Sequence, residues 1–485
     1  MASARVPWTA ARSEHFTLVG DARPEVTAVA ARELERFRAA VEEVTPLRFG
    51  TAPRTVYVFR SARSFRAAAG AVPDVRKLEG LSVEDDSGTV LLAIADSPHG
   101  GLERIRHELV HGLLGGRDLP LWLAEGLAQY LSFFEVSGEE ATFGLPTLAL
   151  HRIEDCGWVP LASVLAATDY PRQDAATCAF YLESALLVQH LAERSEGPAG
   201  LFAFVDRVAG GEHVAAALRS LYGLELRTLD PALRAWAESP RAPVRLALPD
   251  PEAGAAVALA RLPRVEGWIA AADLALAFDD HAAAAEGYRK ALRVEPSNLA
   301  AVSGLGIALA GTRENAEAIA LLEWTQAVDY AREGLDEAYA IALVGRGFER
   351  GGSGLRDDHR EVRQLALSMD ARRPRERKMR SVLVGVASLA DPAPDAVESG
   401  RAALEEGIRS GVPLPVVAPG LLIFAARAGD EEAERRLQPG VVCDREFQRL
   451  TLAVARALRD SARERPEVLA EAARVEALAV FKRER

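Results

Sequence analysis

The sequence predicts an α+β domain up to about residue 240, followed by an all-α region. Before residue 100, short apolar runs that suit strands alternate with amphipathic helical segments. Beyond residue 254, the composition becomes more Ala-rich, and a helical repeat of about 34 residues appears. With 485 residues, 49% of them hydrophobic, the chain can form two or three separate cores.

The first lobe, residues 14–100, is expected to contain a small sheet with helices. A helix is predicted after Pro24, because apolar residues recur there at helical spacing: Val26, Val29, Leu34, Phe37 and Val41. Three runs have the composition of strands: His15–Gly20, Arg54–Phe59 and Thr89–Ala95.

Two consecutive helices are expected at the start of the second lobe, residues 101–240. From Leu102 to Leu114 the apolar residues return at a spacing near 3.6 residues, and two glycines end the segment. After a short turn ending in Pro120, Leu121 to Phe134 has the pattern of a second helix. Because the connection is so short, the two helices should pack antiparallel.

Four residues on these helices form a candidate zinc site. His107 and His111, in an H-E-x-x-H pattern, lie one helical turn apart, so both imidazoles can reach one ion. Glu108 lies beside the first ligand, where it can polarise a metal-bound water. The antiparallel turn can bring Glu125, in the segment W-L-A-E-G-L-A, back toward the histidines as a third ligand. Two His and one Glu leave a position open, as in catalytic zinc sites.

The alternative is a chance or degenerate motif. In a chain of this length an H-E-x-x-H pattern arises by chance with odds on the order of one in a hundred. A histidine on an apolar helix is also commonly a packed core residue. The coincidence of the motif with a second segment that supplies Glu125 favours a metal site.

These residues resemble the gluzincin metallopeptidases, which include thermolysin-related enzymes and aminopeptidases. The chain is most similar to the short peptidase MA-like proteins that are often fused to tetratricopeptide repeats. The resemblance implies a gluzincin-like domain over residues 8–240. Within it, His107, His111 and Glu125 would bind one Zn²⁺, and Glu108 would activate water.

The specific motifs of this resemblance lie between His107 and Tyr181. The gap between His111 and Glu125 is shorter than in thermolysin-like enzymes, which implies a trimmed turn. The G-A-M-E-N motif, with which aminopeptidases recognise a free substrate amine, is absent from the sequence. Exopeptidase activity on N-termini is therefore not expected.

The resemblance also implies a donor for the oxyanion that develops on the scissile carbonyl. Tyr181 opens an apolar helical stretch similar to the Y-E-K-G helix of related aminopeptidases, whose Tyr has this role. The K-G part is not kept here. Two alternatives stay open: Tyr181 is an ordinary helical tyrosine, or His190, further along the same helix, is the donor.

The strand Thr89–Ala95 comes just before the metal-site helix. In the fold that the chain resembles, the strand at this place borders the cleft and pairs with extended substrate backbone. A plain core strand is the equal alternative.

Four more helices are expected after the metal site: Leu161–Ala167, Ala179–Glu193, Leu201–Val208 and Val214–Leu221. From Ser239 to Pro251 the chain contains prolines and few helix signals, so a linker is predicted at residues 241–254.

Residues 255–332 are expected to form tetratricopeptide-like repeats. In a first repeat, the characteristic W, G/A, A, Y/F, A and P positions of the 34-residue pattern are occupied by Trp268, Ala272, Ala284, Tyr288, Ala291 and Pro296. In a second, Leu305-Gly306 and Ala318 fit the pattern, whereas Thr325 and Tyr330 do not. A generic helical hairpin is the alternative.

Residues 333–485 are expected to be helical and to continue the solenoid. Within them, residues 351–378 are charged and rich in Gly and Arg. Interleaved acidic residues and the lack of aromatic residues favour a solvated loop and helix face over a nucleic-acid site.

Composition restricts the partners and the compartment. A net charge of −12 argues against nucleic acid or an anionic membrane surface as a partner. No run approaches about 18 apolar residues, so no membrane span is expected. Met1 to Thr17 lacks the apolar core of a signal peptide; the cytoplasm is the default expectation, and export is the alternative if the start is trimmed.

The three cysteines, Cys156, Cys178 and Cys443, are widely separated and form no C-x-x-C pattern. They suit neither a disulfide framework nor a thiolate zinc site. We expect them to be buried small apolar residues.

The sequence therefore predicts a zinc-dependent peptidase, an endopeptidase acting on a peptide or protein substrate. The helical repeats are expected to offer a surface for a protein partner. The alternative function is a scaffold whose repeats bind a protein partner and whose peptidase domain is inert.

Overall fold

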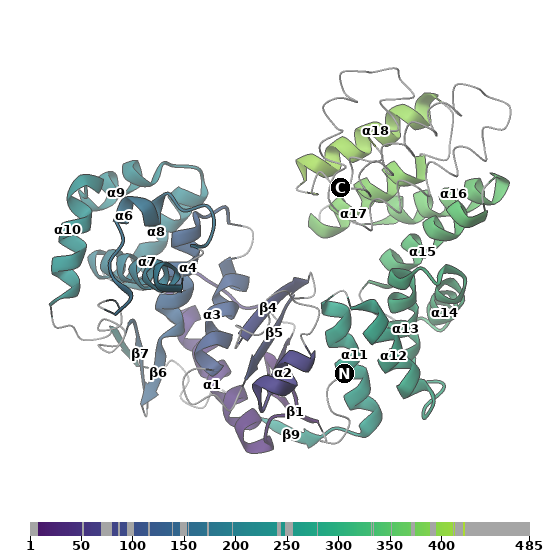
Figure 1. Ribbon diagram of the computed structural model, residues 1–485, viewed down its shortest axis with the longest axis horizontal. Helices are drawn as coiled ribbons and strands as arrows, with labels where there is room; N and C mark the ends of the chain where they lie inside the picture. Colours follow the sequence, from purple (N-terminus) through teal and green to yellow (C-terminus); the bar gives the residue numbers. More distant parts are fainter. Residues whose placement is uncertain are drawn as a thin grey trace. The chain divides into compact units, whose positions relative to one another are not determined.

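The chain divides into two compact units, Met1–Phe278 and Asp279–Arg485 (Figure 1). The computed structural model describes residues 8–50, 53–68, 80–85, 88–94, 101–114, 117–137, 139–145, 153, 155–171, 174–195, 197–239, 244–247, 256–278, 280–330, 332, 334–350, 352–369, 374–388, 394–410, 412 and 421. The first unit combines a small mixed sheet with helices, and the described part of the second is helical.

The main sheet of the first unit has six strands in the order β4-β5-β3-β2-β1-β9. The pairs β2–β3 and β3–β5 are parallel, whereas β1–β2, β1–β9 and β4–β5 are antiparallel. The strands are β1 (Thr9–Arg12), β2 (Phe16–Gly20), β3 (Arg54–Phe59), β4 (Gly80–Asp85), β5 (Gly88–Ile94) and β9 (Ala258–Arg261).

Both faces of this sheet are covered, because alternate residues of β3 enter two different cores. Val56 and Val58 belong to the large core that also contains the apolar face of α1 (Pro24–Val44). Tyr57 and Phe59 belong to a smaller core with residues of α2 (Ala62–Ala68) and α11 (Arg264–Ala277). The strands and helix predicted for this lobe are confirmed as β2, β3, β5 and α1.

The strand predicted at Thr89–Ala95 is an interior strand of the sheet. It is β5, which pairs with β3 on one side and with β4 on the other, so its backbone cannot pair with a substrate. The alternative of a core strand is the correct one. Among the described strands β4 has β5 as its single partner, which makes β4 the edge on this side.

The linker predicted at residues 241–254 contains a strand of a second sheet. The three strands of this sheet are β6 (Phe134–Ser137), β7 (Glu140–Phe143) and β8 (Val244–Ala247), all antiparallel. Strand β8 lies within residues 241–254, and β9 then returns the chain to the main sheet beside β1. The first unit therefore continues past residue 240 to Phe278. The pairing partners are distant in sequence, which local composition does not reveal.

The helices of the first unit beyond the main sheet gather around α7, which packs against α4, α6, α8 and α10. The helices are α3 (Gly101–Leu114), α4 (Leu121–Ser132), α6 (Leu161–Leu165), α7 (Asp174–Arg194), α8 (Pro198–Ala209), α9 (Val214–Tyr222) and α10 (Leu226–Ala237). Each helix predicted in this region is confirmed, whereas α10, with Pro231 inside it, was not predicted.

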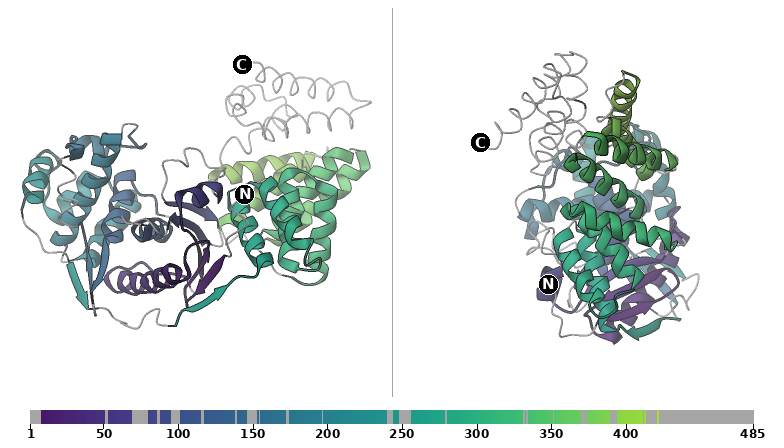
Figure 2. Two further views of the ribbon diagram at one scale, coloured as in Figure 1. Left: turned by 60° about the horizontal axis from the view of Figure 1, so that its bottom comes forward. Right: turned by 90° about the vertical axis from the view of Figure 1, so that its right-hand side faces the viewer.

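Consecutive helices of the second unit pack against one another (Figure 2). Alternate helices α13 and α15, and α15 and α17, are also in contact, as in a helical repeat array. The helices are α12 (His281–Leu292), α13 (Leu299–Thr312), α14 (Asn315–Ala327), α15 (Leu335–Arg350), α16 (Gly352–Ser368), α17 (Pro374–Ser388) and α18 (Pro394–Arg409).

The predicted first repeat, Trp268–Pro296, extends across the boundary between the units. Its first helix, α11, belongs to the first unit, and its second helix, α12, to the second. Ala284 and Tyr288 of α12 are buried, as the repeat pattern requires. Within the described part of the chain, every helix is too short or too polar to span a bilayer.

Candidate metal centre

Helix α3 presents three of the predicted site residues on one partly accessible face. Its other face carries the apolar residues that recur at helical spacing and are buried in the large core: Ile105, Leu109, Val110, Leu113 and Leu114. This burial fixes the rotation of the helix about its axis. His107, Glu108 and His111 are consequently left on the half-buried side.

Two polar contacts set the position of α4 relative to α3. Gln129 Nε2 donates to Glu103 Oε1 at 3.2 Å, and Arg106 Nε donates to the carbonyl oxygen of Ser132 at 2.9 Å. Arg106 and Ser132 are buried, so their bond is protected from competition with water. These contacts hold the two helices in the register that brings Glu125 opposite the histidines.

Gly126 lets α4 approach α7 closely at the position next to Glu125. A Cβ atom at Gly126 would lie 2.6 Å from the carbonyl oxygen of Ser184 on α7 and 2.7 Å from a methyl group of Val188. Close packing of α4 against α7 therefore requires a glycine at this position of the W-L-A-E-G segment. It brings the helix with the third predicted ligand beside the helix that carries Tyr181.

Three ligand atoms converge on one point. Nε2 of His107 and Nε2 of His111 are 3.1 Å apart, and Oε2 of Glu125 lies 3.2 Å and 3.4 Å from them, respectively. An ion bound tetrahedrally at about 2.0–2.1 Å separates its ligand atoms by roughly 3.3–3.4 Å. Within the described part of the chain, His107, His111 and Glu125 are the only group of three or more His, Cys, Asp or Glu residues that could hold a metal ion.

The environment of Glu125 suits a cation. The residue is 3% exposed, and among the described residues its buried Oε2 atom faces the two imidazole nitrogens and has no other hydrogen-bond partner. Burial alone would raise the pKa of this carboxyl, but the two histidines outweigh it and hold the pKa far below the usual range. A buried, ionised oxygen that faces two imidazole nitrogens is what a divalent ion would neutralise. The donor set therefore fits zinc.

Tyr181 lies at this site. The centroid of its ring is 6.2 Å from that of His107. Burial, and then the charges of Glu125 and Glu108, raise its pKa well above the ordinary value, so the phenol keeps its proton at neutral pH. The placement is compatible with the predicted oxyanion donor.

His190, the alternative donor, is buried in the helical lobe. Its Nε2 atom accepts a hydrogen bond from Arg194 Nε at 3.0 Å, and its ring packs edge-on against Trp236 with centroids 4.8 Å apart. These partners identify His190 as a packing residue of α7. They disfavour a role at the metal site.

A second phenol, Tyr170, was missed by the sequence analysis. Its hydroxyl donates to Oε1 of Glu125 at 2.5 Å, and its ring stacks on that of Tyr181 with centroids 6.1 Å apart and planes 21° apart. Tyr170 follows α6 in a segment with no recognisable motif. Because it reaches the site through a long connection, no local signal could have identified it.

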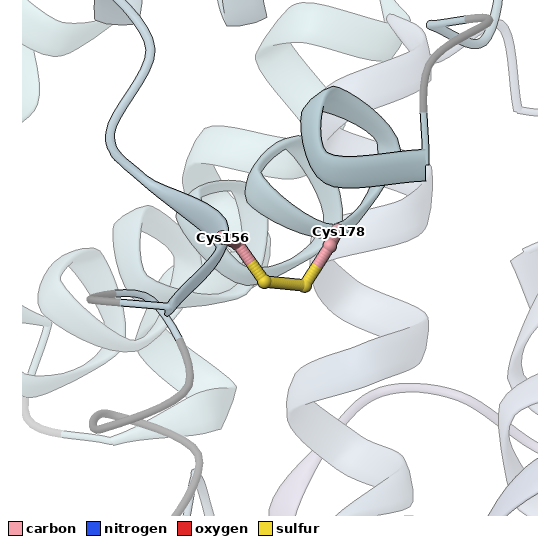
Figure 3. Close-up of a disulfide and its surroundings, with 2 residues drawn as sticks. All are labelled: Cys156 and Cys178. Atoms are coloured by element: carbon pink, nitrogen blue, oxygen red, sulfur yellow. A yellow bond between two sulfur atoms is a disulfide. The ribbon is translucent and has the colours of Figure 1, made fainter.

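The expectation that the cysteines are unpaired apolar residues is wrong for two of them. Cys156 and Cys178 form a disulfide that joins the segment before α6 to the first half of α7 (Figure 3). Their Cα atoms are 5.9 Å apart although 22 positions separate them in sequence. The pairing follows from the chain folding back along α7, which cysteine spacing does not show. Cys443 lies outside the described residues.

Three hydrogen bonds hold the segment between the two cysteines against the helical lobe. The Val159 N–H donates to Glu183 Oε1 at 2.6 Å, and the Leu161 N–H donates to Asp230 Oδ2 at 3.0 Å. Nearer to Tyr170, the Thr177 hydroxyl donates to the Pro171 carbonyl oxygen at 2.7 Å. The segment is thus attached at both of its ends.

Glu183→Gln should make the stability of the fold less dependent on pH. Burial raises the pKa of Glu183 to about 7, against the opposing bond from Val159 and the charge of Arg234. The folded protein therefore favours the neutral carboxyl of Glu183. The contribution of this residue to stability is complete below the ordinary pKa of 4.5 and is lost as the pH rises through about 7. The loss amounts to about 3 kcal/mol, at about 1.4 kcal/mol per pKa unit.

The measurement is the Tm of both proteins between about pH 5 and pH 8. The wild-type Tm should fall relative to that of the variant as the pH rises. Glutamine keeps an oxygen for the Val159 N–H, so the variant should fold. Parallel pH responses would contradict a raised pKa for Glu183.

Comparison of the chain with models of protein families, with curated proteins and with solved structures gives no match.

Proposed function

We propose that this protein is a zinc-dependent peptidase of the gluzincin type, most simply an endopeptidase. The observation that carries the proposal is the convergence of His107 Nε2, His111 Nε2 and Glu125 Oε2 within 3.4 Å of one another. Two imidazoles and one carboxylate are the ligand set of hydrolytic zinc sites, and they leave a coordination position open. Glu108 follows the first of these ligands directly in the chain.

When bound, zinc would polarise the substrate carbonyl and lower the pKa of a water molecule. The Glu108 carboxylate takes a proton from the attacking water as the new carbon–oxygen bond forms. It then delivers this proton to the amide nitrogen as the carbon–nitrogen bond breaks. Tyr181 keeps its own proton and donates a hydrogen bond to the carbonyl oxygen as negative charge develops there.

The main sheet offers an edge for an extended peptide. Strand β4 contacts α3, the helix that carries both histidines, and pairs with β5 alone among the described strands. A peptide that adds to this edge would satisfy backbone groups irrespective of its side chains. Cleavage within a chain suits such a backbone-directed mode better than recognition of a free terminus.

A scaffold with an inert peptidase domain is the second candidate. It is favoured by the helical unit α12–α18, whose successive contacts are those of arrays that bind protein partners. The disulfide Cys156–Cys178 favours, for either function, an oxidising compartment over the cytoplasm.

Metal analysis of protein purified without added metal tests the proposal first. We expect one zinc ion per chain in the wild type and its loss in His111→Ala, because two ligands hold zinc far more weakly than three. His213→Ala is the matched control, since His213 is a helix-capping residue of α9 and should leave the zinc content unchanged. Absence of zinc from the wild type, even after reconstitution, would overturn the proposed function.

A further inference from the structure

The two carboxylate oxygens of Glu125 have different surroundings. Oε2 faces the two histidine nitrogens, whereas Oε1 accepts the hydroxyl hydrogen of Tyr170 at 2.5 Å. A carboxylate can rotate about its terminal bond and can offer one or both oxygens to an ion. With Oε1 engaged by Tyr170, the orientation that presents Oε2 alone is favoured.

Burial does not hold Tyr170 in this place, because 50% of the residue is exposed. Its contacts with the site, among the described residues, are the bond to Glu125, the stacking on Tyr181 and a side-chain hydrogen bond with Tyr181. The chain on its C-terminal side is attached to α7 by the bond between Thr177 and Pro171. A half-exposed aromatic side chain is held less firmly by packing than a buried one, so its position depends more on where the backbone places it.

The disulfide supplies that backbone constraint. Cys156 and Cys178 form the crosslink (Figure 3) and close the segment that contains Tyr170. Cys178 lies on α7, about one helical turn before Tyr181 in the sequence. Closing a loop of this length restricts the conformations open to the segment between the two cysteines. The crosslink thus keeps Tyr170 and Tyr181 on the same side of the site.

We propose that Tyr170 is a positioning residue for the metal ligand Glu125, and that the Cys156–Cys178 disulfide holds Tyr170 against it. The proposal depends on the metal-binding part of the proposed function but not on peptidase activity. A hydrogen-bonded outer residue orients a ligand before the ion arrives, and its removal typically weakens metal affinity about 10–100-fold.

Zinc affinity measured by competition with a chromophoric chelator tests this role without a substrate. Tyr170→Phe should weaken zinc binding about 10–100-fold, because Oε1 loses its partner and the carboxylate gains orientations. Tyr222→Phe is the matched control, since it removes a phenol hydroxyl whose partner is Ser195 and which makes no contact with a predicted ligand.

The absorption spectrum of the Co²⁺-substituted protein gives a second readout that a loss of folding stability would not produce. In the wild type a single Glu125 oxygen favours a four-coordinate ion, which absorbs strongly in the visible region. In Tyr170→Phe the freed second oxygen raises the coordination number, so the visible bands should weaken and shift. An unchanged spectrum together with unchanged zinc affinity would overturn the proposal.

The role of the disulfide is tested by a double-mutant cycle. Cys156→Ser with Cys178→Ser should weaken zinc binding to a similar extent as Tyr170→Phe. When added to Tyr170→Phe, the two serine substitutions should cost no further affinity, because the residue that they position is already gone. Fully additive losses would overturn the link between the disulfide and Tyr170.

Failure of this inference is distinct from failure of the proposed function. A wild-type protein that binds no zinc overturns both. A wild-type protein that binds zinc tightly, with Tyr170→Phe binding it equally well, overturns the positioning role alone. If the serine variants do not fold, Tyr170→Phe still decides that role.

Discussion

Glu108→Gln should lower kcat/KM for peptide cleavage about 10²–10⁴-fold and leave one zinc ion bound. Glutamine has the shape of glutamate but cannot accept the proton of the attacking water, so the general base is lost. Glu108 is half-buried and is not one of the three converging ligands. Zinc binding should therefore persist.

The assay is cleavage of an unfolded protein or a peptide library, with zinc content and Tm measured in parallel. Glu238→Gln, at an exposed position that ends α10, is the control for loss of a carboxylate. If wild type and Glu108→Gln both bind zinc and neither cleaves a broad panel of substrates, the peptidase proposal fails and the scaffold gains.

Tyr181→Phe should lower kcat about 10²–10³-fold, the usual effect of losing one oxyanion donor. The Tyr181 ring lies beside that of the predicted ligand His107, with centroids 6.2 Å apart. KM should change little, because the bond to the carbonyl oxygen strengthens mainly in the transition state.

Steady-state kinetics on a cleaved peptide, combined with zinc titration, separates the two tyrosines of the site. Tyr181→Phe should reduce turnover with zinc affinity unchanged, whereas Tyr170→Phe should reduce zinc affinity. Unchanged kcat in a zinc-loaded Tyr181→Phe variant would return Tyr181 to the alternative of an ordinary helical tyrosine.

Residues close together in sequence account for what could be predicted. His107 and His111 are on one helical face because the helix repeats every 3.6 residues, and Glu125 follows after a turn too short to allow another geometry. Strand β3 was also predictable, because it ends in a run of consecutive apolar residues. Such a run is typical of a strand that is buried on both faces of the sheet, as β3 is. Each of these predictions uses interactions within a segment or across one turn.

Other parts of the site depend on residues that only the folded chain brings together. Tyr170 contacts Glu125 across 45 positions of sequence, and β9 pairs with β1 across the length of the first unit. The edge position of β4 likewise depends on which strands pair, which its own composition does not determine.

The sequence alone determined the periodic helices and the principal strands. It also determined the residues that are proposed to bind the metal ion and to activate the attacking water. Only the tertiary structure decided that Cys156 pairs with Cys178, that Tyr170 binds Glu125, and that the first unit extends to Phe278. The physical reason is that helical and strand periodicity are properties of neighbouring residues. Contacts between distant segments depend instead on how all the elements pack together.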